Sequence, residues 1–158
     1  MPHLLGERSP RWNPSVRASF VGLARSHGRQ HLTRAVLEGV AFNLGICIDA
    51  FRSSGARIDS VDAVGGGAKS DVWLQVLADV WGLPVRRRSI VDEANSLGAA
   101  VLGAVGLGSV PSVDAARSLS VVEAEFVPDA GRTAAYRVAA ERFEQAYASL
   151  EPWYGGTR

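Results

Sequence analysis

The residues best suited to chemistry form a glycine-rich turn, Gly65-Gly66-Gly67-Ala68-Lys69-Ser70. Three consecutive glycines let the backbone turn sharply and let a ligand approach without obstruction by side chains. A helix that follows directly points its first N–H groups and the positive end of its dipole at the turn, which suits a phosphate or ribose oxygen. Ser70 or Asp71 can cap that helix, or offer an oxygen to an adenine amine. The turn is therefore the candidate binding site of the chain.

The spacing of these residues excludes two common phosphate-binding motifs. The Gly-x-x-x-x-Gly-Lys-Ser/Thr pattern of a Walker A loop is absent. From Lys69 onward, no third glycine stands at the offset that a Gly-x-Gly-x-x-Gly fingerprint requires. A tight strand-to-helix turn without a ligand also explains the glycines. From the turn alone, this plain interpretation is favoured over a nucleotide site.

Apolar spacing predicts the elements that position the turn. A strand over residues 58–64 precedes it, and a helix over 69–82 follows it. That helix is apolar almost all round, which predicts that it is largely buried, and Gly82 with Pro84 ends it. A second strand is expected over 83–90. The small side chains of a helix over 95–105 indicate tight contact with a neighbour.

The longest predicted helices flank this segment. A helix over 28–54 carries an apolar stripe at intervals of three and four and ends near Gly55. It contains Gly39 and Gly45, for which close packing against a neighbouring backbone is the natural reason. A final helix is expected over 130–150. Of the remainder, 106–111 indicates a loop, 113–119 a short helix, and 121–127 a segment that could be extended. Residues 1–26 contain three prolines and indicate a connector, with a short strand at 20–23 as an option, while 155–158 indicate a frayed end.

This order of helices and strands predicts the α/β class. Only two strands are clear, so the sheet would be too small for the helices that pack with it. The mismatch indicates that the chain forms part of a larger fold.

Composition narrows the classes of function. The 17 Lys and Arg residues against 16 Asp and Glu leave a net charge of +1, which indicates no nucleic-acid partner. The run Arg86-Arg87-Arg88 is interpreted as a solvated strand end rather than a basic patch. The single Cys47 excludes an internal disulfide and predicts a buried core thiol in an intracellular protein. No apolar stretch reaches the ~20 residues of a membrane span and no secretory signal is visible, so we expect a cytoplasmic location and no membrane partner.

Five stretches together resemble the C-terminal domain of the FGGY carbohydrate kinase family, most closely its xylulokinase members. They run in the family's order from about residue 4 to about residue 106. The stretches are Gly6-Glu7-Arg8-Ser9-Pro10, Phe20-Val21-Gly22-Leu23, Arg34-Ala35-Val36-Leu37-Glu38-Gly39, the glycine turn with Trp73, Gln75 and Ala78-Asp79, and Leu97-Gly98-Ala99-Ala100. Five ordered matches are a far more specific signal than the glycine turn alone.

The resemblance implies an actin-like ATPase fold built on the ribonuclease H-like α/β unit, here with an incomplete sheet and several packed helices. In that family the C-terminal domain holds the adenosine of ATP, and Mg²⁺ lies among the phosphates. Lys69 is expected to be exposed, and Glu38 to make structural hydrogen bonds between elements. Carried over residue by residue, the resemblance implies that the ATP/ADP-binding residues are Gly65, Gly66, Gly67, Ala68, Ser70 and Asp71. Gly66, Gly67 and Ala68 would lie against adenosine and the α-phosphate. Ser70 and Asp71 would lie at the edge of the adenine pocket.

The resemblance also implies what residues 1–158 do not contain. The family's N-terminal domain supplies most of the sugar site and the aspartate that acts as general base, and a phosphate loop precedes the Gly-Glu-Arg segment. We therefore expect a partial C-terminal domain with no catalytic residue and no identifiable Mg²⁺ ligand of its own. It would reach a sugar substrate only through the N-terminal domain. Asn95 also stands where the family usually has a small apolar residue.

Three hypotheses about function stay open at this point. The chain is expected to be the nucleotide-binding part of a sugar kinase, with D-xylulose to D-xylulose 5-phosphate as the leading reaction, and to be inactive by itself. The alternative is a catalytically inactive nucleotide-binding or interaction module derived from such a kinase. A purely structural α/β protein would require the ordered matches to be accidental. The under-built sheet also predicts exposed apolar surface and self-association.

Overall fold

The computed structural model describes residues 1–155, which divide into two compact units. The first unit comprises residues 1–58, 79–82 and the chain from 128 onward, and the second comprises 59–78 and 83–127. Helix α2 (Asp71–Trp81) begins in the second unit, and its last turn belongs to the first.

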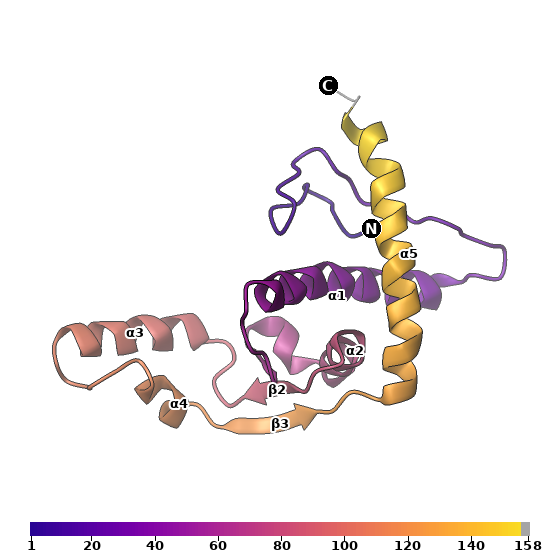
Figure 1. Ribbon diagram of the computed structural model, residues 1–158. Helices are drawn as coiled ribbons and strands as arrows, with labels where there is room; N and C mark the ends of the chain where they lie inside the picture. The colour runs from indigo at the N-terminus through magenta and orange to yellow at the C-terminus, as the bar shows by residue number, and fades with distance from the viewer. Residues whose placement is uncertain (156–158) are drawn as a thin grey trace. The chain divides into compact units, whose positions relative to one another are not determined.

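The second unit is built on a three-stranded sheet in the order β1-β2-β3 (Figure 1). Strands β1 (Val61–Ala63) and β2 (Val85–Arg88) are parallel, whereas β3 (Val122–Phe126) is antiparallel to β2. The segment 121–127 is therefore extended, and it adds a third strand to the two that were clear from the sequence. Strands β1 and β2 are shorter than 58–64 and 83–90, because the flanking residues leave the ladder as the turns begin.

The helix predicted over 69–82 corresponds to α2, which begins at Asp71 and ends at Trp81. A 3₁₀ helix η1 (Gly66–Lys69) precedes α2, and the extended backbone of Ser70 separates them. The Oγ of Ser70 accepts a hydrogen bond from the Trp73 N–H at 3.2 Å, which makes Ser70 the cap of α2. Most of α2 is buried as expected, but Val72 is 63% exposed. The prediction that this helix is largely buried is therefore wrong for its first turn.

The expectation of tight packing around the small-residue helix is also wrong. Helix α3 (Ala94–Gly106) buries only Val101, and a Cβ added to Gly98, Gly103 or Gly106 would meet no atom within 4 Å. The short helix α4 (Ala115–Leu119) follows as predicted. Small residues permit close contact, and α4 does contact α3, but no described atom lies within reach of these three glycines.

The first unit is built on two long helices, α1 (Arg29–Ser53) and α5 (Ala130–Gly155), which cross in Figure 1. The Phe42 ring of α1 packs against that of Phe143 on α5 with 5.6 Å between centroids. Helix α1 ends at Ser53, and Gly55 follows with a φ of +90° that suits glycine and an N–H that donates to the Arg52 carbonyl. Helix α5 continues five residues beyond the predicted end, through Pro152.

Only part of the apolar stripe predicted for α1 is covered. Val36, Leu44 and Phe51 are exposed, and Cys47 is half-buried rather than a core thiol. The buried positions of α1 are Gly39, Ala41 and Phe42. Within the described residues, nothing covers the exposed part of the stripe, which explains the difference from the prediction.

Gly45 packs against a side chain rather than against a backbone. A Cβ added to Gly45 would lie 3.3 Å from Cδ1 of Trp81. The Trp81 indole is held in place because its Nε1 donates to the Ala41 carbonyl at 2.9 Å. The glycine therefore makes room for a fixed indole.

The N-terminal segment is more than a connector, because it supplies buried residues to the first unit. Val16 is buried in a cluster with Tyr147 and Tyr154 of α5. His3 and Glu7 are buried as well. Residues 20–23 form no strand. The fraying expected at the C-terminus concerns 156–158, which lie outside the described residues, whereas Gly155 is helical. No helix within residues 1–155 combines the length and hydropathy that crossing a membrane requires.

Candidate functional site

The glycine turn has a backbone that requires glycine at its first position. Gly65 has φ +80° and ψ −179°, a conformation that side-chain-bearing residues rarely adopt. Its N–H donates to the Val91 carbonyl at 2.7 Å, which ties the turn to the segment that follows β2. The N–H groups of Ala68 and Ser70 donate to the carbonyls of Gly65 and Gly67, respectively, and so close the 3₁₀ turn. The chain therefore enters α2 from a rigid, hydrogen-bonded loop.

The other turn residues differ in what a ligand could touch. A Cβ added to Gly66 would meet no atom within 4 Å, so this residue leaves open space at the surface. A Cβ added to Gly67 would lie 3.3 Å from Nε1 and 3.4 Å from Cδ1 of Trp73. Ala68 is only 2% exposed. Ala68 therefore forms the floor under the turn, and the surface open to a ligand is that of the glycines and Ser70.

Ser70 and Asp71 already have partners within the protein. The Ser70 hydroxyl oxygen accepts the Trp73 N–H, and the hydroxyl keeps its own proton for donation. The Asp71 carboxylate accepts a hydrogen bond from Nη1 of Arg87 on β2 at 2.6 Å. Asp71 is thus an exposed carboxylate held by an ion pair at the start of α2.

Every other described cation beside the turn is paired with a carboxylate as well. Lys69 is exposed, as expected, and its Nζ lies 2.5 Å from Oδ2 of Asp92. Arg88 donates to Asp62 on β1 at 2.7 Å. The turn and its neighbours therefore present little net charge to a ligand.

The arginine run is not a solvated strand end, and this corrects the interpretation from sequence. It forms β2, the central strand, where each guanidinium meets a carboxylate of another element. Arg86 donates to Glu125 on β3 at 2.7 Å. Sequence reasoning missed these pairs because the partners of Arg86, Arg87 and Arg88 lie between 16 and 39 residues away. The only available signal was the acidic residues in the adjacent strands.

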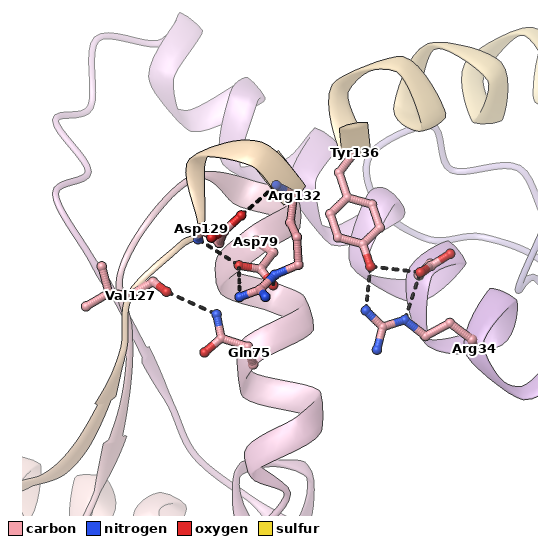
Figure 2. Close-up of polar contacts among 8 residues, drawn as sticks. Arg34, Gln75, Asp79, Val127, Asp129, Arg132 and Tyr136 are labelled. Carbon is pink, nitrogen blue, oxygen red and sulfur yellow. Dashed lines mark hydrogen bonds and ion pairs between the residues drawn. The ribbon is translucent and has the colours of Figure 1, made fainter. Parts of the chain in front are cut away.

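Glu38 makes the inter-element hydrogen bonds that were expected of it. Tyr136 of α5 donates to the Glu38 carboxylate at 2.8 Å, and Arg34 contacts both residues. Figure 2 shows Arg34 and Tyr136 pointing toward one another. Burial raises the pKa of the Tyr136 hydroxyl. The cluster joins α1 to α5 and lies apart from the glycine turn in sequence. Within residues 1–155, the His, Cys, Asp and Glu side chains form no group of three or more that could hold a metal ion.

Comparison with known proteins adds information about the whole chain. Residues 1–107 match the C-terminal domain of the FGGY family of carbohydrate kinases. The xylulose kinase of Escherichia coli strain K12 is 38% identical over 152 residues, which are 96% of this chain and 31% of that protein. The gluconokinase of Bacillus subtilis strain 168 is 40% identical over 118 residues, which are 72% of this chain and 22% of that protein.

Solved structures agree with the sequence comparison. The ligand-bound xylulose kinase from Lactobacillus acidophilus superposes with a TM-score of 0.90 and 27% identity, covering 99% of this chain and 32% of that one. The chain therefore spans about a third of the length of the two xylulose kinases. Its similarity to the Lactobacillus acidophilus structure extends over almost all of its own residues.

Proposed function

The chain belongs to the FGGY family of carbohydrate kinases, and from this premise we propose that it is the nucleotide-binding part of a kinase that phosphorylates a sugar hydroxyl with ATP. Its fold is the actin-like ATPase fold of that family, of which these residues form a partial sheet with packed helices. Residues 1–158 would form part of the C-terminal domain, with the sugar-binding domain outside them.

The observation that carries this proposal is the open glycine turn at the start of α2. Gly65 adopts the left-handed conformation, and Gly66 leaves free space for a ligand. The N–H groups of Asp71 and Val72 belong to the first turn of an eleven-residue helix, where donors lack intrahelical partners. The turn thus fits adenosine, whose planar base can lie against a backbone without side chains and whose polar atoms can accept hydrogen bonds from a few N–H groups.

In the working kinase, ATP with Mg²⁺ would supply the phosphoryl group. The role of this chain is to bind and orient the nucleotide. Gly66 and Gly67 would lie against adenosine, Ser70 and Asp71 would border the adenine, and Gly65 and Ala68 would keep the turn in shape. Positioning of this kind is a large part of catalysis in phosphoryl transfer.

The sugar is proposed from the relatives alone. D-xylulose is the leading substrate, because the relatives that match nearly the full chain include xylulose kinases. Gluconate is the second candidate, because a gluconokinase matches 72% of the chain at similar identity. The described residues do not distinguish these two sugars.

One observation favours a second function for the isolated chain, namely nucleotide binding without catalysis. The carboxylates of Asp62, Asp71 and Asp92 beside the turn are each ion-paired with a cation. A general base needs a carboxylate that is free to accept the proton of the sugar hydroxyl.

The proposal is tested by titrating the ¹⁵N-labelled chain with ADP and following the amide spectrum. We expect shifts centred on residues 65–72, with an affinity on the order of millimolar, or about −4 kcal/mol, because few donors are charged. Gly66→Val would fill the open space and abolish binding, and the fold is expected to persist because a Cβ at this position meets no neighbour. Gly67→Val is a poorer probe, because its Cβ meets the Trp73 indole.

The matched control is Gly103→Val on α3, a position that also has open space around it. It should bind ADP like the wild type. Shifts that avoid the turn, or equal binding by the Gly66→Val variant, would show that the site lies elsewhere.

A further inference from the structure

We propose that the indole N–H of Trp73 is a binding group of the glycine turn and donates a hydrogen bond to a ribose oxygen of the bound nucleoside. The inference rests on the proposed function, and it adds a residue that neither the motif nor its spacing had assigned a role.

The geometry places the polar edge of the indole at the turn. The site where Gly67 would carry a Cβ lies 3.3 Å from Trp73 Nε1 and 3.4 Å from its Cδ1. Trp73 is half-buried and occupies the third position of α2, where its backbone N–H is held by the Ser70 hydroxyl. The cap therefore fixes the residue whose side chain borders the glycines. A side chain at Gly67 would press on this indole.

Within residues 1–155, the indole N–H of Trp73 donates to no protein acceptor. In contrast, Trp81 donates its Nε1–H to the Ala41 carbonyl at 2.9 Å. For Trp73, only the backbone N–H is hydrogen-bonded within residues 1–155. The Trp73 side chain is half-buried, so water can reach it in the free chain, and a ligand that covers the indole would have to supply the acceptor that a buried indole N–H generally has.

The charges around the turn indicate to which part of a nucleotide the Trp73 indole N–H would donate its hydrogen bond. Lys69 and Arg87 are already paired with Asp92 and Asp71, so a phosphate would have to compete with carboxylates for them. The side-chain donors that remain, the Trp73 indole and the Ser70 hydroxyl, are neutral. Ribose hydroxyls are neutral acceptors and suit these donors. We therefore assign Trp73 to the nucleoside rather than to the phosphates.

The test uses the indole ¹H–¹⁵N signals of the 158-residue chain, which has four tryptophans. Trp73→Phe assigns the relevant signal by its loss. Adenosine, AMP and ADP should all shift the Trp73 signal, whereas inorganic pyrophosphate should leave it in place. The Trp81 signal serves as an internal reference that should not move.

Affinity provides a second measurement. Trp73→Phe keeps an aromatic ring but removes the pyrrole part of the indole with its N–H donor, so adenosine should bind at least about three- to tenfold more weakly, the loss expected for one hydrogen bond. The matched control, Trp12→Phe, changes an exposed tryptophan of the N-terminal segment and should bind normally. The amide spectrum of each variant reports whether it is folded.

Three outcomes distinguish a failure of this inference from a failure of the proposed function. If adenosine or ADP binds at residues 65–72 but the Trp73 indole signal stays unmoved, the inference is overturned and the proposed function stands. A Trp73 signal that responds to pyrophosphate as strongly as to adenosine would overturn the assignment to the nucleoside. If neither adenosine, AMP nor ADP binds the chain, the proposed function fails and the inference fails with it.

Discussion

The Arg132 guanidinium on α5 donates to the buried carboxylate of Asp79, in the last turn of α2, with 2.7 Å between Nε and Oδ2 (Figure 2). The other carboxylate oxygen of Asp79 accepts the N–H of Asp129 at 2.9 Å. Asp129 in turn accepts the Arg132 N–H and so caps the start of α5. One buried acid therefore holds the start of α5 through two separate donors.

Asp79→Ala should destabilise the fold by about 2 to 3 kcal/mol, because it removes charge-assisted hydrogen bonds and leaves a part-buried N–H without its acceptor. Urea unfolding of wild type and variant measures the difference. Asp49→Ala is the matched control, because Asp49 is exposed and pairs only with Arg52 on its own helix, where such pairs contribute little. Equal losses in both variants would contradict this role for Asp79.

Glu7 should make stability depend on pH. Burial raises the pKa of the Glu7 carboxyl, although the neighbouring Arg11 and a hydrogen bond from Tyr147 act in the opposite direction. A raised pKa means that the folded chain holds the proton more tightly than the unfolded chain. The resulting stability is present below the ordinary glutamate pKa and is lost as pH rises through the folded value.

The comparison with Glu7→Gln isolates this effect, because glutamine can still accept the Tyr147 hydrogen bond and does not titrate. The free energy of unfolding of the wild type relative to Glu7→Gln should fall as pH rises from acidic to neutral. Glu141→Gln, at an exposed position of α5, should show no such trend. A wild type that gains stability over Glu7→Gln with rising pH would reverse the assigned sign.

Replacing a helical glycine by alanine should stabilise the chain at Gly103 but not at Gly45. Gly103→Ala on α3 should stabilise the chain by up to about 1 kcal/mol, because the added methyl meets nothing and alanine favours the helix. Gly45→Ala should lose this gain, because its Cβ would press on the Trp81 indole, which is fixed by its bond to Ala41. Thermal unfolding of both variants measures the contrast, and equal stabilisation would refute it.

The chain should associate with a second copy through the exposed apolar side chains Val36, Leu44 and Phe51 of α1. Val36 lies eight residues before Leu44 and Phe51 lies seven after it, so two antiparallel copies would pair the same surface about Leu44. Sedimentation at micromolar concentrations should show a dimer for the wild type and a monomer for Leu44→Lys. Val138→Lys, on α5, is the control. A wild type that stays monomeric would count against the prediction.

The 158-residue chain should bind nucleotide without phosphorylating sugar. The reason is that the family resemblance places the general base and the phosphate loop outside residues 1–158, and phosphoryl transfer depends on both. A coupled assay of ADP release with D-xylulose and with gluconate tests this, with an intact sugar kinase as the positive control. Release of ADP that depends on either sugar and exceeds the background would contradict the prediction.

Several features were readable from the sequence because their causes are local. The glycine turn, the Ser70 cap and the end of α1 near Gly55 depend on backbone conformation and on neighbours within a few residues. Helix periodicity likewise located α1 and α5. The ordered motifs added the family, because several such stretches rarely recur together by chance.

Only the tertiary structure decided which of these residues face one another. The pairing of Asp71 with Arg87, and of Asp62 with Arg88, follows from the register of distant segments, which no local pattern encodes. An apolar or small residue is buried only when another element covers it. The exposed stripe of α1 and the uncovered α3 therefore could not be foreseen from periodicity or residue size. The sequence alone determined the glycine turn and the family of the chain, because both depend on local residues. Only the tertiary fold determined that paired charges leave the turn nearly neutral and that the Trp73 indole borders it.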